Sequence, residues 1–314
     1  MARLADLIDL VRAPAALSVP GDLIAGASAA GALTPATGAL AGASVCLYWA
    51  GMAANDWADR DLDAVERPER PIPSGRVRPA TAAGLAAGLT AAGLGIAALG
   101  GGRRSLGVAV PLAAAIWAYD LRAKNTAAGP AVMAACRALN VLLGATTGRT
   151  LTGPLRRALP TAAAVAAHTY TVTALSRREV SGATPTLPAA TLAATGALGA
   201  AIAAGPAPRA VGAGSSPVAG SVTPAPRKAG GSPSRAAVVG ALAGQYLAGY
   251  GAAQARAVAS PTPAAVRAAV GAGITGLPAL QGALTARAGS PVAGLLVAAA
   301  APLARMLARK VSPT

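Results

Sequence analysis

Long apolar stretches alternate with short polar segments along most of the chain. A helix needs about 20 mostly apolar residues to cross a bilayer, so each stretch near that length predicts a transmembrane helix. The stretches run over residues 14–33, 36–54, 80–100, 105–121, 127–148, 155–175, 184–204, 236–258, 264–286 and 290–308. The stretch 264–286 contains Arg267, Pro278 and Gln281, so it is a full span, a broken span or an interfacial helix. We therefore predict an all-α integral membrane protein of about nine transmembrane helices, forming a single membrane domain over residues 1–314.

Two segments differ from this pattern. In residues 1–12, apolar side chains recur at helical spacing, at Leu4, Leu7, Ile8 and Val11. That spacing predicts a short interfacial helix. Residues 205–235 are rich in Pro, Gly and Ser and show no periodicity, which predicts a flexible basic linker within the membrane domain.

The composition supports the bilayer as the solvent. The chain is 54% hydrophobic and 12% charged, whereas a soluble domain usually has about 25% charged residues. Its net charge of +16 also suits nucleic-acid binding, but the arginines lie in short gaps between apolar stretches, as in loops beside anionic headgroups. We expect membrane lipids as partners, and no nucleic acid. The abundance of Ala, Gly, Pro and Arg, with no Phe, indicates the codon bias of a GC-rich bacterial genome.

The direction of the helices gathers the polar segments. Consecutive spans alternate in direction, so the ends of the second, fourth and sixth lie on one side of the membrane. Those ends are residues 55–79, 122–126 and 176–183, and all three contain Arg or Lys. Positive residues favour the cytoplasm, which predicts a cytoplasmic face in the cell membrane. A few arginines on the opposite side run against this prediction: Arg103, Arg104, Arg156 and Arg157.

The most conspicuous polar segment is Asn-Asp-Trp-Ala-Asp-Arg-Asp-Leu-Asp at residues 55–63. Asn55, Asp59 and Asp63 are spaced i, i+4, i+8, so a continuous helix would project them along one stripe. Such a stripe repels itself unless a cation lies on it. Hard oxygen ligands suit Mg²⁺, which takes one or two carboxylates together with waters and phosphates. The alternative is a solvated acidic loop that neighbouring arginines balance.

An arginine-rich turn follows this acidic segment. Three prolines and a glycine between residues 67 and 77 predict an ordered turn. Arg67 and Arg70 in this turn can donate paired hydrogen bonds to a diphosphate. The alternative is the ordinary positive charge of a cytoplasmic loop.

Together these segments resemble the first motif of the UbiA prenyltransferase superfamily. The matching patterns are Asn-Asp-x-x-Asp-x-x-x-Asp at residues 55–63 and Arg-Pro-Ile-Pro-Ser-Gly at residues 70–75. Residues 12–22 resemble the start of the family, and residues 119–125 resemble its basic Tyr…Lys segment after the fourth helix. The resemblance covers about the first 200 residues, and the tail from Ala279 to Ser312 resembles a less characterised EboC-like bacterial branch.

The resemblance implies a helical bundle that opens laterally to lipid and has its active site at the cytoplasmic face. It implies a Mg²⁺-dependent ionisation of a prenyl diphosphate and transfer of the prenyl group to an acceptor. Carried onto this sequence, Asn55 and Asp59 would bind Mg²⁺, and Asp63 would support a second ion or a water. Arg122 and Lys124 would hold the diphosphate.

The chain departs from the family at the second motif, which is usually Asp-x-x-x-Asp before a Gly. Residues 176–182 here read Ser-Arg-Arg-Glu-Val-Ser-Gly, so Glu179 is the one carboxylate available as a further catalytic and metal-binding residue. Two interpretations follow. Arg177 and Arg178 hold the diphosphate directly in place of the second ion's charge, or catalysis is altered or lost.

We therefore expect a multi-pass membrane prenyltransferase. Its substrates would be a polyprenyl diphosphate and a small-molecule or lipid acceptor that the sequence does not identify. A terpene cyclase on the same scaffold is one alternative, because the same site would ionise the same substrate. A non-catalytic membrane protein that binds isoprenoid lipids is another, and the altered second motif favours it.

Overall fold

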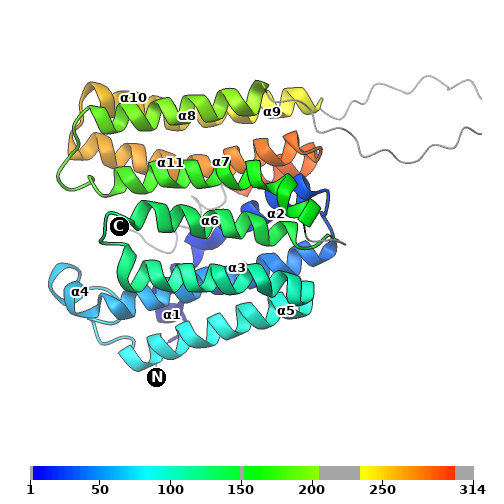
Figure 1. The fold of residues 1–314 in the computed structure, drawn as a ribbon. Helices are drawn as coiled ribbons and strands as arrows, with labels where there is room; N and C mark the ends of the chain where they lie inside the picture. The colour runs from blue at the N-terminus through cyan, green and yellow to red at the C-terminus, as the bar shows by residue number, and fades with distance from the viewer. Residues whose placement is uncertain (1–2, 149–151, 205–233, 301–314) are drawn as a thin grey trace, which may run out of the picture.

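The computed structural model describes residues 3–148, 152–204 and 234–300, and every regular element in these ranges is helical. Long helices lie side by side in layers, roughly along one direction (Figure 1). The elements are α1 (Leu4–Leu10), η1 (Ala13–Ser18), α2 (Val19–Ala30), α3 (Pro35–Ala58), α4 (Arg60–Glu66), α5 (Pro79–Ala118), η2 (Tyr119–Ala123), α6 (Gly129–Ala145), α7 (Thr152–Ser176), α8 (Thr186–Ala204), α9 (Arg235–Tyr246), η3 (Leu247–Gly251), α10 (Ala252–Ala259) and α11 (Pro263–Arg287). A short apolar helix, Pro291–Ala300, follows. The predicted all-α fold is confirmed.

Four of the described helices are long and apolar enough to cross a membrane: α3, α5 with η2, α8 and α11. The stretch 264–286, which the sequence left open, is one helix of 25 residues with Pro278 inside it. Nearly all of the predicted linker 205–235, and the end of the stretch 290–308, lie outside the described residues. The count of nine spans and the single-domain organisation therefore stay predictions.

Helix α5 is a hairpin of two antiparallel helices that meet at Gly102. Gly102 has φ 63° and ψ −154°, a conformation that glycine adopts without a Cβ clash. Trp117 Nε1 donates a hydrogen bond to Thr90 Oγ1 at 3.0 Å. On a straight helix these two residues would lie about 40 Å apart. The chain reverses at Gly102, so both ends of α5 lie at the same end of the bundle, as the sequence pattern predicted.

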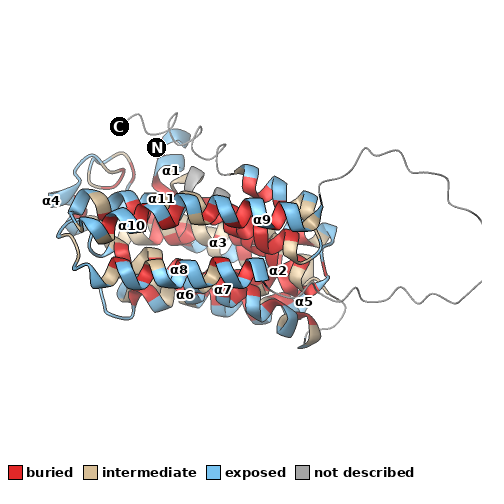
Figure 2. Cartoon of the chain, turned by 90° about the horizontal axis from the view of Figure 1, so that it is seen from above, coloured by how far each residue is buried: buried red, intermediate tan, exposed pale blue. Residues whose placement is uncertain are grey.

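Exposed residues lie on the outward faces of the helices, whereas buried residues lie where helices face one another (Figure 2). Leu99 is 91% exposed and Leu296 is 70% exposed. Large apolar side chains on an outer surface suit contact with lipid chains. This surface, with the four apolar helices, supports a membrane protein.

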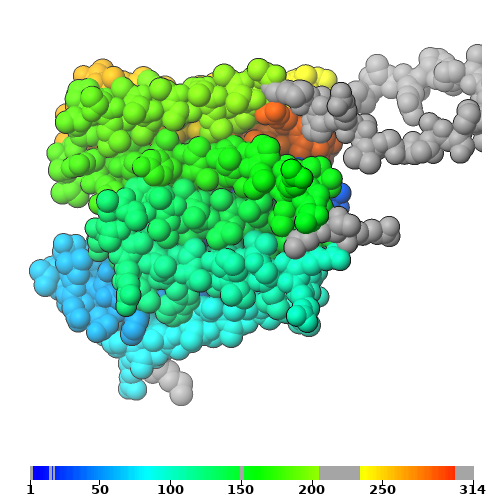
Figure 3. Space-filling model, viewed as in Figure 1, coloured from blue at the N-terminus to red at the C-terminus, as the bar shows by residue number. Residues whose placement is uncertain are grey.

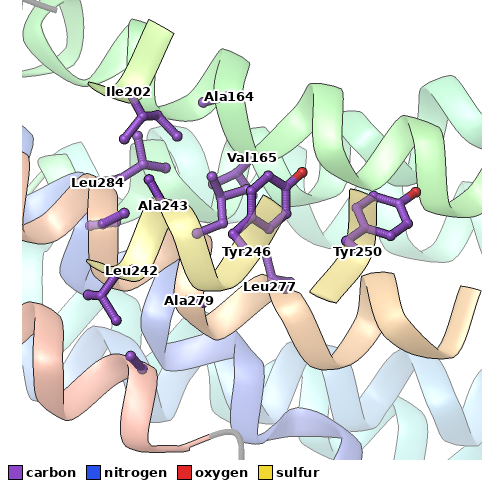
Figure 4. Packing of buried hydrophobic residues seen from close by; sticks show 14 of the residues in the cluster. Ala164, Val165, Ile202, Leu242, Ala243, Tyr246, Tyr250, Leu277, Ala279 and Leu284 are labelled. Atoms are coloured by element: carbon purple, nitrogen blue, oxygen red, sulfur yellow. The ribbon is translucent and has the colours of Figure 1, made fainter. Parts of the chain in front are cut away.

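Part of the core lies between α7, α8, α9 and α11. Val165, Ile202, Leu242, Tyr246 and Leu284 converge there from these four helices (Figure 4). His168 is buried beside this cluster, and its Nδ1 lies 2.9 Å from the hydroxyl of Tyr246. His168 is therefore a hydrogen-bonded packing residue.

A buried polar cluster joins α2 to α6 and α11. Asp22 is fully buried and accepts hydrogen bonds from three side chains: Arg137 at 3.2 Å, Asn140 at 3.0 Å and Gln281 at 2.7 Å. Arg137 Nε also lies 2.9 Å from the second carboxylate oxygen of Asp22. A charge within an apolar bundle is stabilised only when it is paired and hydrogen-bonded, so the cluster fixes the relative positions of these three helices.

Candidate active site

Three polar segments meet at one end of the bundle, where α4 projects beyond the long helices (Figures 1 and 3). Lys124 Nζ, just after η2, donates to Asp59 Oδ2 at 2.6 Å. Arg177, just after α7, donates through Nη1 to the backbone carbonyl of Thr126. The three segments that helix direction assigned to one side are therefore joined by direct contacts.

The acidic segment is not one straight helix. Helix α3 ends at Ala58, and Asp59 caps it with φ −90° and ψ 3°, outside regular helical geometry. Helix α4 begins at Arg60. Asn55 and Asp59 keep part of their surface exposed, whereas Asp63 is 1% exposed. The expected stripe of three oxygen ligands is therefore divided, and Asn55 and Asp59 form its accessible part.

Asp63 is buried because the following turn neutralises it. Arg70 Nη1 donates to Asp63 Oδ2 at 2.5 Å and lies 3.4 Å from Asp56 Oδ1. Arg67 lies 3.8 Å from Asp63, and Arg12 donates to Asp56 at 2.6 Å. These arginines bind the protein's own carboxylates, and the contact of Arg70 with Asp56 joins the turn to α3. The predicted contacts of Arg67 and Arg70 with a diphosphate, and of Asp63 with an ion, stay predictions.

A π-helical turn brings Lys124 to the site. The backbone N–H of Lys124 donates to the carbonyl of Tyr119 at 3.0 Å, five residues back, within η2. Lys124 is 12% exposed and Asp59 is 22% exposed, so their ion pair is shielded from most of the solvent. Arg122 lies on the same turn and is exposed, and no ion pair of Arg122 occurs among the described residues.

The same turn supplies a residue that sequence reasoning missed. Asp120 is 4% exposed, and its Oδ1 accepts a hydrogen bond from Asn55 Nδ2 at 3.2 Å. The available signal was its position inside the Tyr…Lys segment, two residues before Arg122 and four before Lys124. The end of α3 thus has two carboxylates around Asn55, at Asp59 and Asp120.

Two residues of the altered second motif, Arg177 and Glu179, contact different parts of the protein. Gly129 leaves room for Arg177, because a Cβ at position 129 would lie 3.3 Å from the Arg177 Nη1 atom. Glu179 lies instead toward α11, where Arg267 donates to its backbone carbonyl at 3.4 Å. Burial raises the pKa of the Glu179 carboxyl, and the charge of Arg267 opposes that rise.

No hydrogen bond or ion pair of the described residues joins Glu179 to Asn55 or Asp59. Arg178 is exposed and lines a surface hollow with Ser181 and Thr184. The roles predicted for Glu179 and Arg178 therefore stay predictions, and Arg177 is the residue of this motif with a contact to the other segments.

The donor atoms at this end of the bundle fit a magnesium ion. Within the described ranges, no three His, Cys, Asp or Glu side chains converge on a common metal position. Mg²⁺ does not require such a set, since it commonly takes one or two carboxylates and completes its shell with water and substrate phosphates. The Asp59 carboxylate and the amide oxygen of Asn55 are hard donors of this kind at a partly exposed position.

The fold and the site define a helical membrane protein whose polar chemistry is gathered at one end of its bundle. The model of the UbiA prenyltransferase family matches residues 16–222, and the chain belongs to this family. The family predicted from residues 55–75 is thereby confirmed, whereas the EboC-like branch stays a prediction.

Solved structures show the same fold. A structure reported for digeranylgeranylglyceryl phosphate synthase in membranes has a TM-score of 0.61 and 14% identity, and the match covers 91% of this chain and 98% of that chain. The apo structure of a UbiA homolog from Aeropyrum pernix K1 has a TM-score of 0.50 and 21% identity, covering 95% of this chain and 97% of that one. At these identities the likeness concerns the fold alone.

Sequence relatives match over shorter regions. Digeranylgeranylglyceryl phosphate synthase of Methanopyrus kandleri is 41% identical over 110 residues, covering 34% of this chain and 38% of that protein. The protein of the same name from Ignicoccus hospitalis is 40% identical over 92 residues, covering 29% and 30%. The bacteriochlorophyll synthase 33 kDa chain of Rhodobacter capsulatus is 60% identical over 40 residues, 12% of each chain. The chain thus matches less than two fifths of the length of these relatives, and the predicted bacterial source stays a prediction.

Proposed function

We propose that this protein is a membrane prenyltransferase that ionises an isoprenoid diphosphate with the help of Mg²⁺ and transfers the prenyl group to an acceptor. The observation that carries the proposal is the meeting of Asp59, Lys124 and Arg177 at one end of the bundle. A carboxylate suited to a cation lies against an ammonium group, and a guanidinium contacts the same loop. These are the groups that recognise a metal-bound diphosphate.

Each residue then has a defined task. Asn55 and Asp59 would hold Mg²⁺, which when bound would neutralise the negative charge that grows on the departing diphosphate. Lys124 lies against Asp59 already, so it would reach the oxygens of a diphosphate bound at that position. Arg177 would supply positive charge where the family's second motif usually has carboxylates. Fixed positive groups of this kind act on the charge that develops in the transition state.

The reaction balances without a further co-reactant. The bond between C1 of the prenyl chain and the diphosphate oxygen breaks, and both electrons leave with the diphosphate. An oxygen of the acceptor forms the new bond to the allylic C1 and releases its proton to water. Relatives named digeranylgeranylglyceryl phosphate synthase lead us to propose a lipid acceptor that bears a hydroxyl group.

The proposal is tested with the purified full chain in detergent, labelled geranylgeranyl diphosphate, Mg²⁺ and a total membrane lipid extract. A labelled lipid that appears only with the extract supports transfer. A labelled hydrocarbon or terpene alcohol formed without the extract would instead establish a terpene cyclase. Binding of the labelled substrate with no release of diphosphate would establish a non-catalytic isoprenoid-binding protein and overturn the proposal.

We also propose that the face carrying this site is cytoplasmic, because segments 55–79, 122–126 and 176–183 are rich in Arg and Lys. A cysteine placed at the exposed Asp61, labelled with an impermeant maleimide, reports its side. Labelling only after the membrane is opened supports the cytoplasmic face. Labelling of intact cells or spheroplasts would show that this face lies outside the cytoplasm and that the proposed orientation is wrong.

A further inference from the structure

Asp120 is a buried carboxylate that, among the described residues, makes one side-chain hydrogen bond, from the amide of Asn55. It comes from a different segment of the chain, 65 residues away. Two local features hold it there. The π turn of η2 places it on the inner side of the helix, and Gly51 leaves the space that it occupies, because a Cβ at position 51 would lie 2.8 Å from Asp120 Oδ2.

The contact fixes which way the Asn55 amide is turned. An asparagine amide has an NH₂ group that donates and an oxygen that accepts, and a rotation of half a turn exchanges them. In the structure the NH₂ group of Asn55 faces Asp120, which suits a carboxylate, because an ionised carboxylate accepts hydrogen bonds and does not donate them. The Asn55 oxygen takes no part in this contact, and Asn55, like Asp59, keeps part of its surface exposed.

This orientation has a chemical consequence, because only the oxygen of an amide ligates a hard cation such as Mg²⁺. We propose that Asp120 is a positioning residue that holds the Asn55 amide in the orientation that binds the cation. The proposal rests on the proposed function, since it concerns the cation that assists departure of the diphosphate. Asp120 would thus act together with Asn55 of the first motif, although it belongs to the Tyr…Lys segment in the sequence.

The test measures binding of Mn²⁺ by electron paramagnetic resonance, with the full chain in detergent and a thiolodiphosphate analogue of geranylgeranyl diphosphate that does not ionise. Asp120→Ala is expected to raise the dissociation constant of Mn²⁺ by about tenfold or more, the range seen when a group that orients a metal ligand is lost. Asp120→Asn keeps an acceptor oxygen for Asn55 and is expected to stay within about threefold of the wild type. The matched control is Asp61→Ala, since Asp61 is 87% exposed and pairs only with Arg60 among the described residues.

A double-mutant cycle separates positioning from a general structural effect. In an Asn55→Ala background, Asp120→Ala is expected to weaken Mn²⁺ binding by less than about twofold, because the amide that it orients is gone. A full tenfold loss in that background, or Mn²⁺ binding by Asp120→Ala equal to the wild type, would overturn the proposal.

If Asp120→Ala does not fold, an exchange variant decides. Asn55→Asp/Asp120→Asn reverses donor and acceptor, and it is expected to bind Mn²⁺ about tenfold more tightly than Asn55→Asp alone, in which two carboxylates face each other. Equal binding by these two variants would refute the positioning role. If the wild type binds Mn²⁺ and releases diphosphate, and the Asp120 variants bind Mn²⁺ as tightly as the wild type, this inference alone is wrong. If the wild type never releases diphosphate, the proposed function is wrong.

Discussion

Lys124 Nζ and Asp59 Oδ2 lie 2.6 Å apart, although 65 residues separate them along the chain. The pair joins the end of α3 to the π turn after α5, and both side chains are largely shielded from solvent. Neither residue belongs to the core of the bundle, so the pair is a contact between the polar segments at the end of the bundle. Under the proposed function, this contact brings the carboxylate that would bind the cation next to the ammonium group that would bind the diphosphate.

Lys124→Met removes the ammonium group and keeps most of the apolar stem. We expect it to lower kcat/KM for diphosphate release by about 100-fold or more, because a fixed positive group beside the leaving diphosphate is lost. Lys124→Arg should retain part of the activity, since its charge is kept while its geometry changes. Diphosphate release is measured with a coupled phosphate assay, and a Lys124→Met enzyme within twofold of the wild type would contradict the role.

Arg70 is expected to stabilise the fold even when no substrate is present. Asp56 and Asp63 are 3% and 1% exposed, and Arg70 bridges them. Arg70→Met leaves these carboxylates buried without that partner and should lower the free energy of unfolding by about 3 kcal/mol. The exposed Arg78→Met, in the same segment, is the matched control in thermal unfolding. Equal unfolding midpoints for the two variants, with a raised KM for Arg70→Met, would instead favour a diphosphate-binding arginine.

The Asp22–Arg137 pair gives a prediction about the interior. Arg137→Met leaves Asp22 as a buried charge and is expected to lower the free energy of unfolding by about 3–5 kcal/mol. Replacing both residues, as Asp22→Leu/Arg137→Met, removes the charge as well as its partner and should be less destabilising than Arg137→Met alone. Unfolding midpoints in one detergent compare the two, and a double variant less stable than the single would contradict this account.

Helix α1 should become less stable in acid. Asp6 accepts a hydrogen bond from Arg76 at 3.1 Å, which lowers the pKa of the Asp6 carboxyl below its ordinary value of about 3.9. Because the folded state has the lower pKa, the contact stabilises fully above about pH 4 and is lost as the pH falls through the folded-state pKa. Hydrogen exchange of residues 4–10, corrected for intrinsic rates, should rise across that interval. Asp6→Asn should show the fast exchange already at pH 6, and a wild type with flat protection to pH 3 would refute the prediction.

The arrangement of the helices and the meeting of the three polar segments could be predicted from the sequence. Both follow from local signals, namely apolar length and the alternation of direction. Gly102 shows why this worked for α5: the break between two apolar stretches coincides with a glycine that can reverse the chain. Asn55 and Asp59 were predicted together because their spacing is one helical turn.

The remaining features depend on contacts between distant segments. The predicted stripe assumed a regular helix through Asp63, but Arg70 captures that carboxylate and the helix is interrupted at Asp59. Asp22 finds its partners 115 to 259 residues away, and no local pattern shows that three polar side chains will converge on it. The inward position of Asp120 depends on a π turn, and the composition of residues 119–123 does not predict such a turn.

The central claim is that Asp59 takes part in Mg²⁺-assisted ionisation of an isoprenoid diphosphate. The most direct measurement is the rate of diphosphate release from geranylgeranyl diphosphate by the purified chain, in Mg²⁺ and in EDTA, for the wild type, Asp59→Asn and Asp61→Asn. We expect release only in Mg²⁺, a loss of about 100-fold or more for Asp59→Asn, and wild-type rates for the exposed Asp61→Asn. Release that continues in EDTA, or an Asp59→Asn rate equal to that of Asp61→Asn, would contradict the account.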